Sequence, residues 1–241
     1  MAIALALAGG AAAESEGSDA GLPVEQVEKI VREYLMREPE IIYQALEELQ
    51  RRQAEATAER QRAAVAANRG QLVDQPDDPM AGNPDGNVTL VEFFDYQCQY
   101  CRTVVPALQA LLNEDRNLKV VFKEFPILGE ASVTAARAAL AARAQERYLP
   151  FHLALMSARD LSLDGIMAAA ERVGLDTERL ATDMQSPAIE AQLQANFELA
   201  RELGIEGTPA FVVGDELIPG AVEKTRLAEL IEDARSDCLT C

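Results

Sequence analysis

The sequence predicts an α/β fold in which a block of helices interrupts a small sheet, with a further helical segment ahead of it. Three observations lead to this prediction. Residues 87–94 and 118–125 are β-branched and aromatic runs separated by a helical pattern, which implies parallel strands joined by a right-handed crossover. Residues 130–204 have helical periodicity almost throughout. Strand-like residues return only at 210–218, before a last helix predicted at 223–234.

The charge and the first residues limit where the protein works and what it binds. Forty acidic and twenty-two basic residues give a formal net charge of −18, which opposes binding to nucleic acid or to an anionic membrane. Residues 1–20 are predicted to be a signal-peptide remnant and a disordered start, because an Ala/Leu run ends in three alanines and acidic residues follow. We therefore expect export to an oxidising compartment. The alternative is a disordered Ala-rich tail, since no basic residue precedes the run.

Residues 22–70 are predicted to form a helical oligomerisation stalk. Apolar residues recur at helical spacing from Val24 to Leu49. A break is expected at Glu38–Pro39, because the residue before a proline is pushed out of helical geometry. We expect this stripe to contact another subunit. The alternative is that it packs on the chain's own catalytic domain.

The second helix of the stalk is expected to run from about residue 39 to residue 68, with Gly70 as its end. Beyond Leu49 it is rich in Arg, Glu and Ala and has almost no large apolar side chains, so it is predicted not to bury itself on a core. A linker rich in Pro and Asp at 71–86 is expected to separate the stalk from a catalytic domain at 87–236.

Cys98 and Cys101 form a CxxC pair at the point where the first strand gives way to a helix. The spacing by itself serves zinc knuckles, structural disulfides and thiol-disulfide exchange alike. At the start of a helix, free N–H groups and the positive end of the dipole stabilise a thiolate. Cys98 is therefore predicted to be the nucleophile of a redox-active disulfide, and Cys101, one turn on, the resolving cysteine.

Thr208 and Pro209 stand directly before the third strand. A proline cannot donate to a sheet ladder and is unexpected there unless it makes a special turn, which a cis peptide bond provides. The order of strand, CxxC, helix, strand, helical insertion, Thr-Pro, hairpin and last helix resembles the thioredoxin fold of DsbA-like thiol-disulfide oxidoreductases. The resemblance covers residues 87 to about 235.

The resemblance implies several properties of the site. In that family the turn before the third strand is a cis-proline lying against the active disulfide, so Thr208 and Pro209 are expected to bind substrate, together with Gln99 and Tyr100 between the cysteines. The backbone there would pair with an extended peptide. No cofactor is expected.

The run from Glu92 to Cys101 and the helical N-terminal segment look most like the ScsC branch of the family, which implies a periplasmic homotrimer. Gln99 and Tyr100 replace the Pro-His of DsbA, so no imidazolium supports the thiolate and the pair is expected to be less oxidising. Tyr100 as the second residue between the cysteines, together with Thr208 before the proline, resembles the pattern of the isomerases DsbC and DsbG. We expect a disulfide isomerase or reductase, with a dithiol oxidase as the first alternative and a copper- or zinc-binding protein as an alternative of another class. The expected partners are unfolded or misoxidised exported proteins and a membrane thiol reductase or oxidase.

Two charged residues are candidates for proton transfer. Glu92 lies six residues before Cys98, and Lys123 lies on the neighbouring strand. A buried acid there takes the proton from Cys101, and Lys123 is expected to hold that acid charged. DsbA has a similar acid and base. The alternative is an exposed charged pair.

A second CxxC pair, Cys238 and Cys241, forms the end of the sequence. It is predicted to form a local disulfide, with electron relay to Cys98 or binding of a soft metal such as copper as alternatives. The single histidine, His152, is predicted to pack in the helical insertion rather than to act in catalysis.

Overall fold

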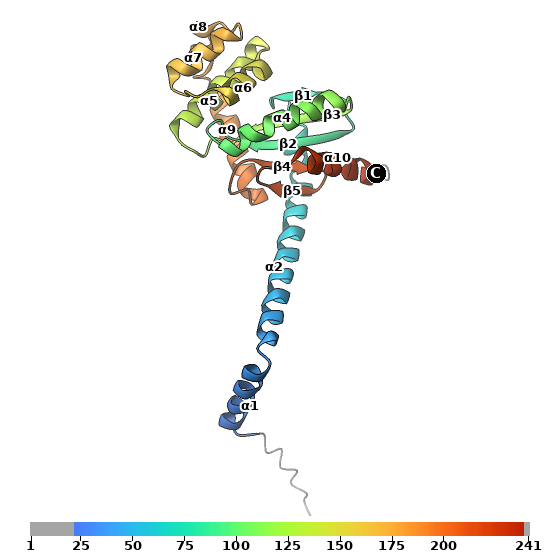
Figure 1. The fold of residues 1–241 in the computed structure, drawn as a ribbon. Coiled ribbons are helices and arrows are strands. Elements are labelled where there is room, and N and C mark those ends of the chain that lie inside the picture. The colour runs from blue at the N-terminus through green and yellow to red at the C-terminus, as the bar shows by residue number, and fades with distance from the viewer. Residues whose placement is uncertain (1–21, 239–241) are drawn as a thin grey trace, which may run out of the picture. The chain divides into compact units, whose positions relative to one another are not determined.

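The computed structural model describes residues 22–238. The chain divides into two compact units, Met1–Ala54 and Glu55–Cys241. Figure 1 shows their elements. The division falls inside the second helix, well before the boundary that the sequence predicts at residue 70.

The described part of the first unit consists of α1 (Val24–Arg37) and the beginning of α2 (Glu40–Ala67). The predicted break is present, because Glu38 leaves helical geometry with φ −125° and ψ 63° just before Pro39. No residue of α1 is buried. Among residues 22–238, no helix is both long and apolar enough to cross a membrane. The stripe of large apolar side chains on α1 and α2 is exposed in this chain: Val24, Val27, Ile30, Val31, Tyr34, Ile42, Tyr43, Leu46 and Leu49.

The second unit is built on a five-stranded sheet with the strand order β1-β3-β2-β4-β5. β2 (Val88–Phe94) and β3 (Leu118–Glu124) run parallel, and α4 (Gln99–Glu114) connects them as the predicted crossover. β4 (Ala210–Val213) pairs antiparallel with β2 and with β5 (Glu216–Pro219). The predicted α/β fold with a helical insertion is thereby confirmed.

Alternation along the strands divides the core into two clusters. Leu90 and Phe94 of β2 belong to the larger cluster, which includes α4, α10 (Lys224–Cys238) and the inserted helices. Val91 and Phe93 belong to the smaller cluster on the other face, which contains apolar residues of α9 and of the end of α2. The inserted helices are α5 (Glu130–Ala141), η1 (Ala142–Gln145), α6 (Tyr148–Ser157), α7 (Leu163–Arg172), α8 (Thr177–Asp183) and α9 (Pro187–Leu203).

The end of the predicted stalk packs on the catalytic domain, which corrects the expectation that this helix stays off a core. Val65 of α2 and Leu72 of α3 (Arg69–Val73) are each 1% exposed and belong to the smaller cluster. One large apolar residue at the end of α2 and one in α3 are enough here, because small neighbours such as Ala64 let the helix approach closely. Gly70 lies inside α3 and does not end the helix.

The predicted linker also contains structure. β1 (Met80–Gly82) pairs antiparallel with β3 at the edge of the sheet, with Met80 opposite Val121. A three-residue strand has no periodicity to detect, so the turn residues around it dominated the sequence pattern.

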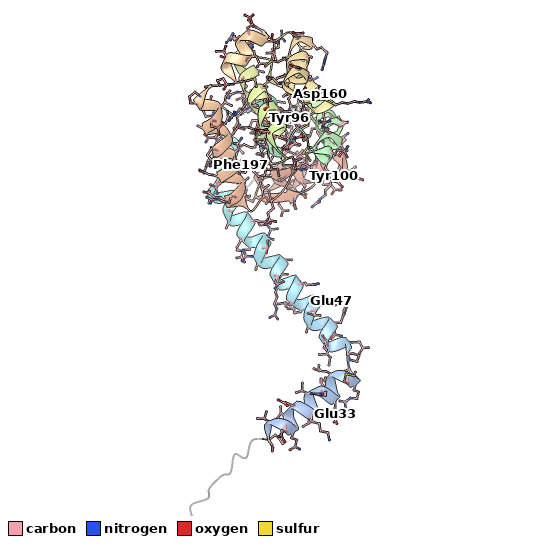
Figure 2. All side chains as sticks on the ribbon, turned by 90° about the vertical axis from the view of Figure 1, so that its left-hand side faces the viewer. Glu33, Glu47, Tyr96, Tyr100, Asp160 and Phe197 are labelled. Carbon is pink, nitrogen blue, oxygen red and sulfur yellow. The ribbon has the colours of Figure 1, made fainter. Side chains whose placement is uncertain are left out.

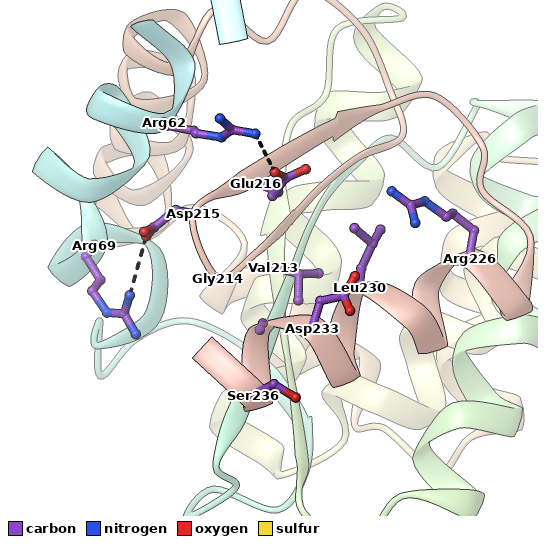
Figure 3. A pocket seen from close by; sticks show the side chains of 11 residues that line it. Arg62, Arg69, Val213, Gly214, Asp215, Glu216, Arg226, Leu230, Asp233 and Ser236 are labelled. Carbon is purple, nitrogen blue, oxygen red and sulfur yellow. Dashed lines mark hydrogen bonds and ion pairs between the residues drawn. The ribbon is translucent and has the colours of Figure 1, made fainter. Parts of the chain in front are cut away.

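The hairpin of β4 and β5 contacts the end of α2 and the start of α3 through ion pairs. Arg62 lies 2.8 Å from Glu216, and Arg69 lies 3.7 Å from Asp215, at a pocket of about 900 Å³ (Figure 3). These exposed pairs each contribute little to stability. The pocket lies at the hairpin end of β4, whereas Thr208 and Pro209 precede its other end.

Candidate active site

Cys98 caps the N-terminus of α4, as the sequence predicts. Its backbone is extended, with φ −67° and ψ 112°, and its Sγ accepts a hydrogen bond from the Cys101 N–H at 3.2 Å. Cys98 is 5% exposed, Cys101 is fully buried, and both are free thiols. The buried strand β2 and the amphipathic helix α4 hold the two sulfurs together because both elements pack in the larger cluster.

The surroundings give the two thiols opposite properties. The hydrogen bond from the Cys101 thiol, followed by the Thr208 side chain and the N–H groups of Cys101 and Tyr100, lowers the pKa of Cys98 to about 6 against the effect of burial. Burial and the hydrogen bond to Cys98 raise the pKa of Cys101 far above its ordinary value. At neutral pH the site therefore holds a thiolate ready to attack and a protonated thiol behind it.

The residues predicted to bind substrate lie around Cys98. Its Sγ is 3.3 Å from the backbone carbonyl oxygen of Thr208, and the Thr208–Pro209 peptide bond is cis. Tyr100 is 68% exposed (Figure 2), and Gln99 is also exposed. The structure thus brings Thr208, far along the sequence, to the sulfur that the sequence identifies as the nucleophile.

Glu92 is the buried acid beneath the pair. It is 1% exposed, and its Oε1 has no hydrogen-bond partner within the described residues. Burial, together with the charge of Cys98, raises the pKa of Glu92 to about 8. The charge of Glu92 in turn contributes to the raised pKa of Cys101, after burial and the hydrogen bond to Cys98. Glu92 is therefore a buried carboxyl group that titrates near neutral pH and interacts electrostatically with both cysteines.

Lys123 does not support Glu92, which corrects the predicted pairing of these residues. Phe93 is the register partner of Lys123, and Phe122 is the partner of Glu92, so the two charged side chains point to opposite faces of the sheet. Lys123 Nζ donates to the Gln71 carbonyl oxygen at 2.6 Å and to the Asp78 carboxylate. The buried Lys123 fastens the segment between α3 and β1 to the sheet and takes no part in the cysteine site.

Sequence reasoning missed a buried acid on the Glu92 face. Glu124 Oε1 accepts hydrogen bonds from the hydroxyl groups of Tyr96 and Tyr148 at 3.0 and 2.9 Å. The Tyr96 hydroxyl also lies 3.1 Å from His152 Nδ1. Burial raises the pKa of Glu124 well above its usual range and lowers that of His152 to about 3. The predicted packing role of His152 is confirmed, because its ring also packs on Phe94 at 4.9 Å. A glutamate among apolar residues of a buried strand was the available signal for Glu124.

The second cysteine pair stays a prediction. Cys238 is the last residue of α10, and Cys241 lies outside the described residues. Among the side chains that the structure describes, which end at residue 236, no group of three or more His, Cys, Asp or Glu is arranged to hold a metal ion.

Two family models match the chain. Residues 89–232 match the DSBA-like thioredoxin domain, and residues 24–56 match the N-terminal domain of the copper resistance protein ScsC. The second match ends close to the boundary between the two compact units.

Solved structures and curated proteins are similar to different shares of this chain. A thioredoxin-like oxidoreductase from Silicibacter pomeroyi DSS-3 is 48% identical, with a TM-score of 0.69 over 70% of this chain and 98% of that one. A linker-deletion mutant of ScsC from Proteus mirabilis is 29% identical, with a TM-score of 0.70 over 91% of this chain and 100% of that one. The Na(+)/H(+) antiporter NhaA of Herminiimonas arsenicoxydans is 28% identical over 167 residues, which cover 68% of this chain and 26% of the antiporter.

The chain thus spans about a quarter of the length of the first curated relatives that it matches. The DSBA-like family model, in contrast, covers more than half of the chain, including Cys98, Cys101 and the Thr208–Pro209 turn. The chain therefore belongs to the DsbA-like family of thioredoxin-fold thiol-disulfide oxidoreductases and carries a ScsC-type N-terminal domain.

Proposed function

We propose that this protein catalyses thiol-disulfide exchange on protein substrates, chiefly as an isomerase or reductase. The observation that carries the proposal is the pair of opposed thiols: Cys98 with its pKa lowered to about 6 at a helix N-terminus, and Cys101 buried behind it. A thiolate that is exposed to an incoming disulfide at one edge is the nucleophile that exchange requires.

The first step joins enzyme and client. The Cys98 thiolate attacks one sulfur of a client disulfide, forms a mixed disulfide, and displaces the other client sulfur as a thiolate. The Thr208 carbonyl oxygen, 3.3 Å from Cys98 Sγ, supports a role for the Thr208–Pro209 turn in binding an extended client segment. Gln99 and Tyr100 face solvent beside it and contact the client side chains.

The second step has two outcomes. In isomerisation, another client thiolate attacks the mixed disulfide at the client sulfur and releases the Cys98 thiolate. In reduction, Cys101 transfers its proton to Glu92 and attacks Cys98 Sγ, so that the client thiolate leaves and the Cys98–Cys101 disulfide remains. The mixed disulfide removes the Cys98 charge, which is one of the two causes of the raised pKa of Glu92. The pKa of Glu92 therefore falls, and more of Glu92 is ionised when Cys101 must lose its proton.

The isomerase direction is favoured by the state of Cys101. Its thiol is fully buried, and burial, the largest cause of its raised pKa, persists in the mixed disulfide, so we expect its attack there to be slow. A long-lived mixed disulfide gives client thiols time to re-pair. A membrane thiol reductase is then required to keep Cys98 reduced.

A dithiol oxidase is the runner-up. The low pKa of Cys98 makes its thiolate a good leaving group, so a Cys98–Cys101 disulfide would pass readily to client thiols. Copper or zinc binding by the cysteine pairs is the alternative of another class.

One refolding experiment separates these functions. Scrambled ribonuclease, with all its disulfides formed wrongly, regains activity with reduced enzyme only if the enzyme isomerises. Reduced ribonuclease regains activity with oxidised enzyme only if the enzyme oxidises. We expect the first assay to respond more strongly, and Cys98→Ser to abolish it without added metal. Full activity of that variant would refute the exchange mechanism.

The exposed stripe on α1 and α2 supports self-association. Nine large apolar side chains at helical spacing are exposed on these two helices. We propose that residues 22–54 form the contact between copies, with a homotrimer as the expected state and the periplasm as the expected location. Several Cys98 sites facing one client raise the local thiol concentration, which favours disulfide shuffling.

A further inference from the structure

Asp95 occupies an unusual position between β2 and the CxxC helix. It is 1% exposed, yet its carboxylate accepts four hydrogen bonds. Its Oδ1 accepts from the Gln97 N–H at 2.6 Å and the Ser132 hydroxyl at 2.7 Å. Its Oδ2 accepts from the N–H groups of Ile127 and Leu128, both at 2.9 Å. A carboxylate buried to this extent is costly, and four donors are what make the burial tolerable.

The same residue contacts both cysteines through its backbone. The Asp95 carbonyl oxygen accepts from the Cys98 N–H at 3.1 Å, and the Asp95 backbone acts to lower the pKa of Cys101 against the larger effect of burial. The side chain and the backbone of Asp95 therefore bind different parts of the protein. The backbone holds the cysteines, and the carboxylate holds the segment 127–128 and the start of α5 at Ser132.

Gln97 reinforces this arrangement from the neighbouring position. Its Nε2 donates to the Leu128 carbonyl oxygen at 3.2 Å and to the Ser132 hydroxyl at 2.9 Å. The residues bonded to Asp95 are thus bonded to one another as well. We call residues 95–98 the Cys98 loop. This loop is hydrogen-bonded to the segment after β3 and to the start of α5.

The sign of the charge excludes a direct electrostatic role in activating Cys98. A buried negative charge close to a thiolate disfavours that thiolate. The charge of the Asp95 carboxylate therefore disfavours the Cys98 thiolate, and the carboxylate can help the reaction only through the hydrogen bonds that it accepts. We propose that Asp95 is a positioning residue for the exchange reaction. Its carboxylate connects the Cys98 loop to residues 127–132 by hydrogen bonds and so holds Cys98 Sγ at the N-terminus of α4.

This inference rests on the proposed exchange function but is tested without it. In Asp95→Asn, the charge is lost and an NH₂ group replaces one carboxylate oxygen. Because an NH₂ group cannot accept a hydrogen bond, the hydrogen bonds on that side of the carboxylate are lost. The measurement is the rate of iodoacetamide alkylation of Cys98 against pH, followed on the Cys98 peptide by mass spectrometry. If Asp95 positions the loop, the pKa of Cys98 rises by about one unit, because the N–H groups of α4 no longer converge on the sulfur. If its charge is what matters, that pKa falls.

Two further variants complete the design. Ser132→Ala removes one of the four donors, keeps the charge, and is expected to move the pKa of Cys98 in the same direction by a smaller amount. Asp160→Asn is the matched control, because Asp160 also accepts from an N–H two residues on and from a serine hydroxyl, but on the exposed insertion (Figure 2). It is expected to leave the titration of Cys98 unchanged.

The outcomes decide the proposal in every case. Folding of each variant is checked by its thermal unfolding curve. If Asp95→Asn is folded and the pKa of Cys98 is unchanged or lower, the positioning role is refuted. If Asp95→Asn does not fold, Ser132→Ala decides, and an unchanged titration in that variant refutes the proposal. A protein whose Cys98 titrates as expected but which exchanges no disulfides would refute the proposed function while leaving the role of Asp95 in place.

Discussion

At the scale of single residues, burial and hydrogen bonds give Cys98 and Cys101 their different reactivities. Cys98 gains hydrogen bonds that favour its charged form, whereas for Cys101 the effect of burial exceeds the opposing effect of the Asp95 backbone. Glu92, on the strand before them, is buried and interacts with the Cys98 charge, so its pKa is raised to about 8. The chemistry of the site thus depends on which buried group keeps its hydrogen-bond donors.

Replacing Cys101 tests the largest contribution to the Cys98 thiolate. In Cys101→Ala, the thiol that donates to Cys98 is lost, so we expect the pKa of Cys98 to rise from about 6 toward its ordinary value. Cys101→Ser retains a donor and should show a smaller rise. The pH dependence of Cys98 alkylation measures both. A pKa of Cys98 that stays near the parent value in both variants would show that the N–H groups alone stabilise the thiolate.

Glu92→Gln should affect rate and stability in opposite ways. Without the base, attack by Cys101 on a mixed disulfide should slow by about a hundredfold. Because the folded-state pKa of Glu92 is raised from 4.5 to about 8, the native protein binds the extra proton, and its stability falls as pH rises between these values. The variant should therefore unfold with the same free energy as the parent below pH 4.5 and be several kcal/mol more stable above pH 8.

The measurements for Glu92→Gln are urea unfolding between pH 4 and 9 and rapid quenching of a mixed disulfide. A stability difference that is constant across this pH range would show that Glu92 titrates normally.

At the scale of elements, the sheet separates catalysis from anchoring by its two faces. Glu92 and Glu124 lie on the face that carries α4 and the insertion, whereas Lys123 lies on the other face, bonded to Gln71 and Asp78. One strand therefore serves both purposes through the alternation of its side chains. This is why a lysine next to the active-site strand has no part in the site.

Lys123→Met tests this separation. It leaves Asp78 buried without its cation, so we expect a loss of about 3–5 kcal/mol in the free energy of unfolding. The titration of Cys98 should not change, because Lys123 faces away from it. Lys123→Met combined with Asp78→Leu should recover much of the stability, since two apolar side chains replace a buried ion pair. Urea unfolding and alkylation rates measure these effects. A shifted Cys98 titration in Lys123→Met would contradict the assignment of faces.

At the scale of the whole molecule, the compact units do not coincide with the divisions visible in the sequence. Residues 55–73, which look like the rest of a stalk, contribute Val65 and Leu72 to the core of the catalytic unit. The exposed apolar stripe ends at Leu49, just before the division. Any separation of the two functions must therefore be made near residue 54.

Changes in the stripe should alter assembly and not chemistry. Val31→Asp combined with Leu46→Asp places charges on the exposed apolar face, and we expect the oligomer to dissociate to monomers because a contact between copies cannot bury unpaired carboxylates. Light scattering measures the mass. Isomerisation of scrambled ribonuclease should fall at least several-fold, while reduction of a small disulfide is retained. Glu28→Gln and Glu47→Gln are controls on the same helices. An unchanged mass in the charged variant would place the interface elsewhere.

The sequence by itself determined the order of the elements, the fold class and the central pair of the site. Buried strands, the CxxC helix and α9 from Pro187 to Leu203 follow local periodicity and capping, which neighbouring residues control. Cys98 as the nucleophile follows from its place at the start of α4. Thr208 and Pro209 were expected at the site from the family resemblance.

Only the tertiary structure decided the partners of the buried charged groups. Lys123 with Asp78, Glu124 with two tyrosines, and Asp95 with Leu128 and Ser132 are contacts between distant segments. Which face of a strand a side chain takes depends on register, and which donors reach a buried carboxylate depends on packing. Neither is encoded in the spacing of residues along the chain.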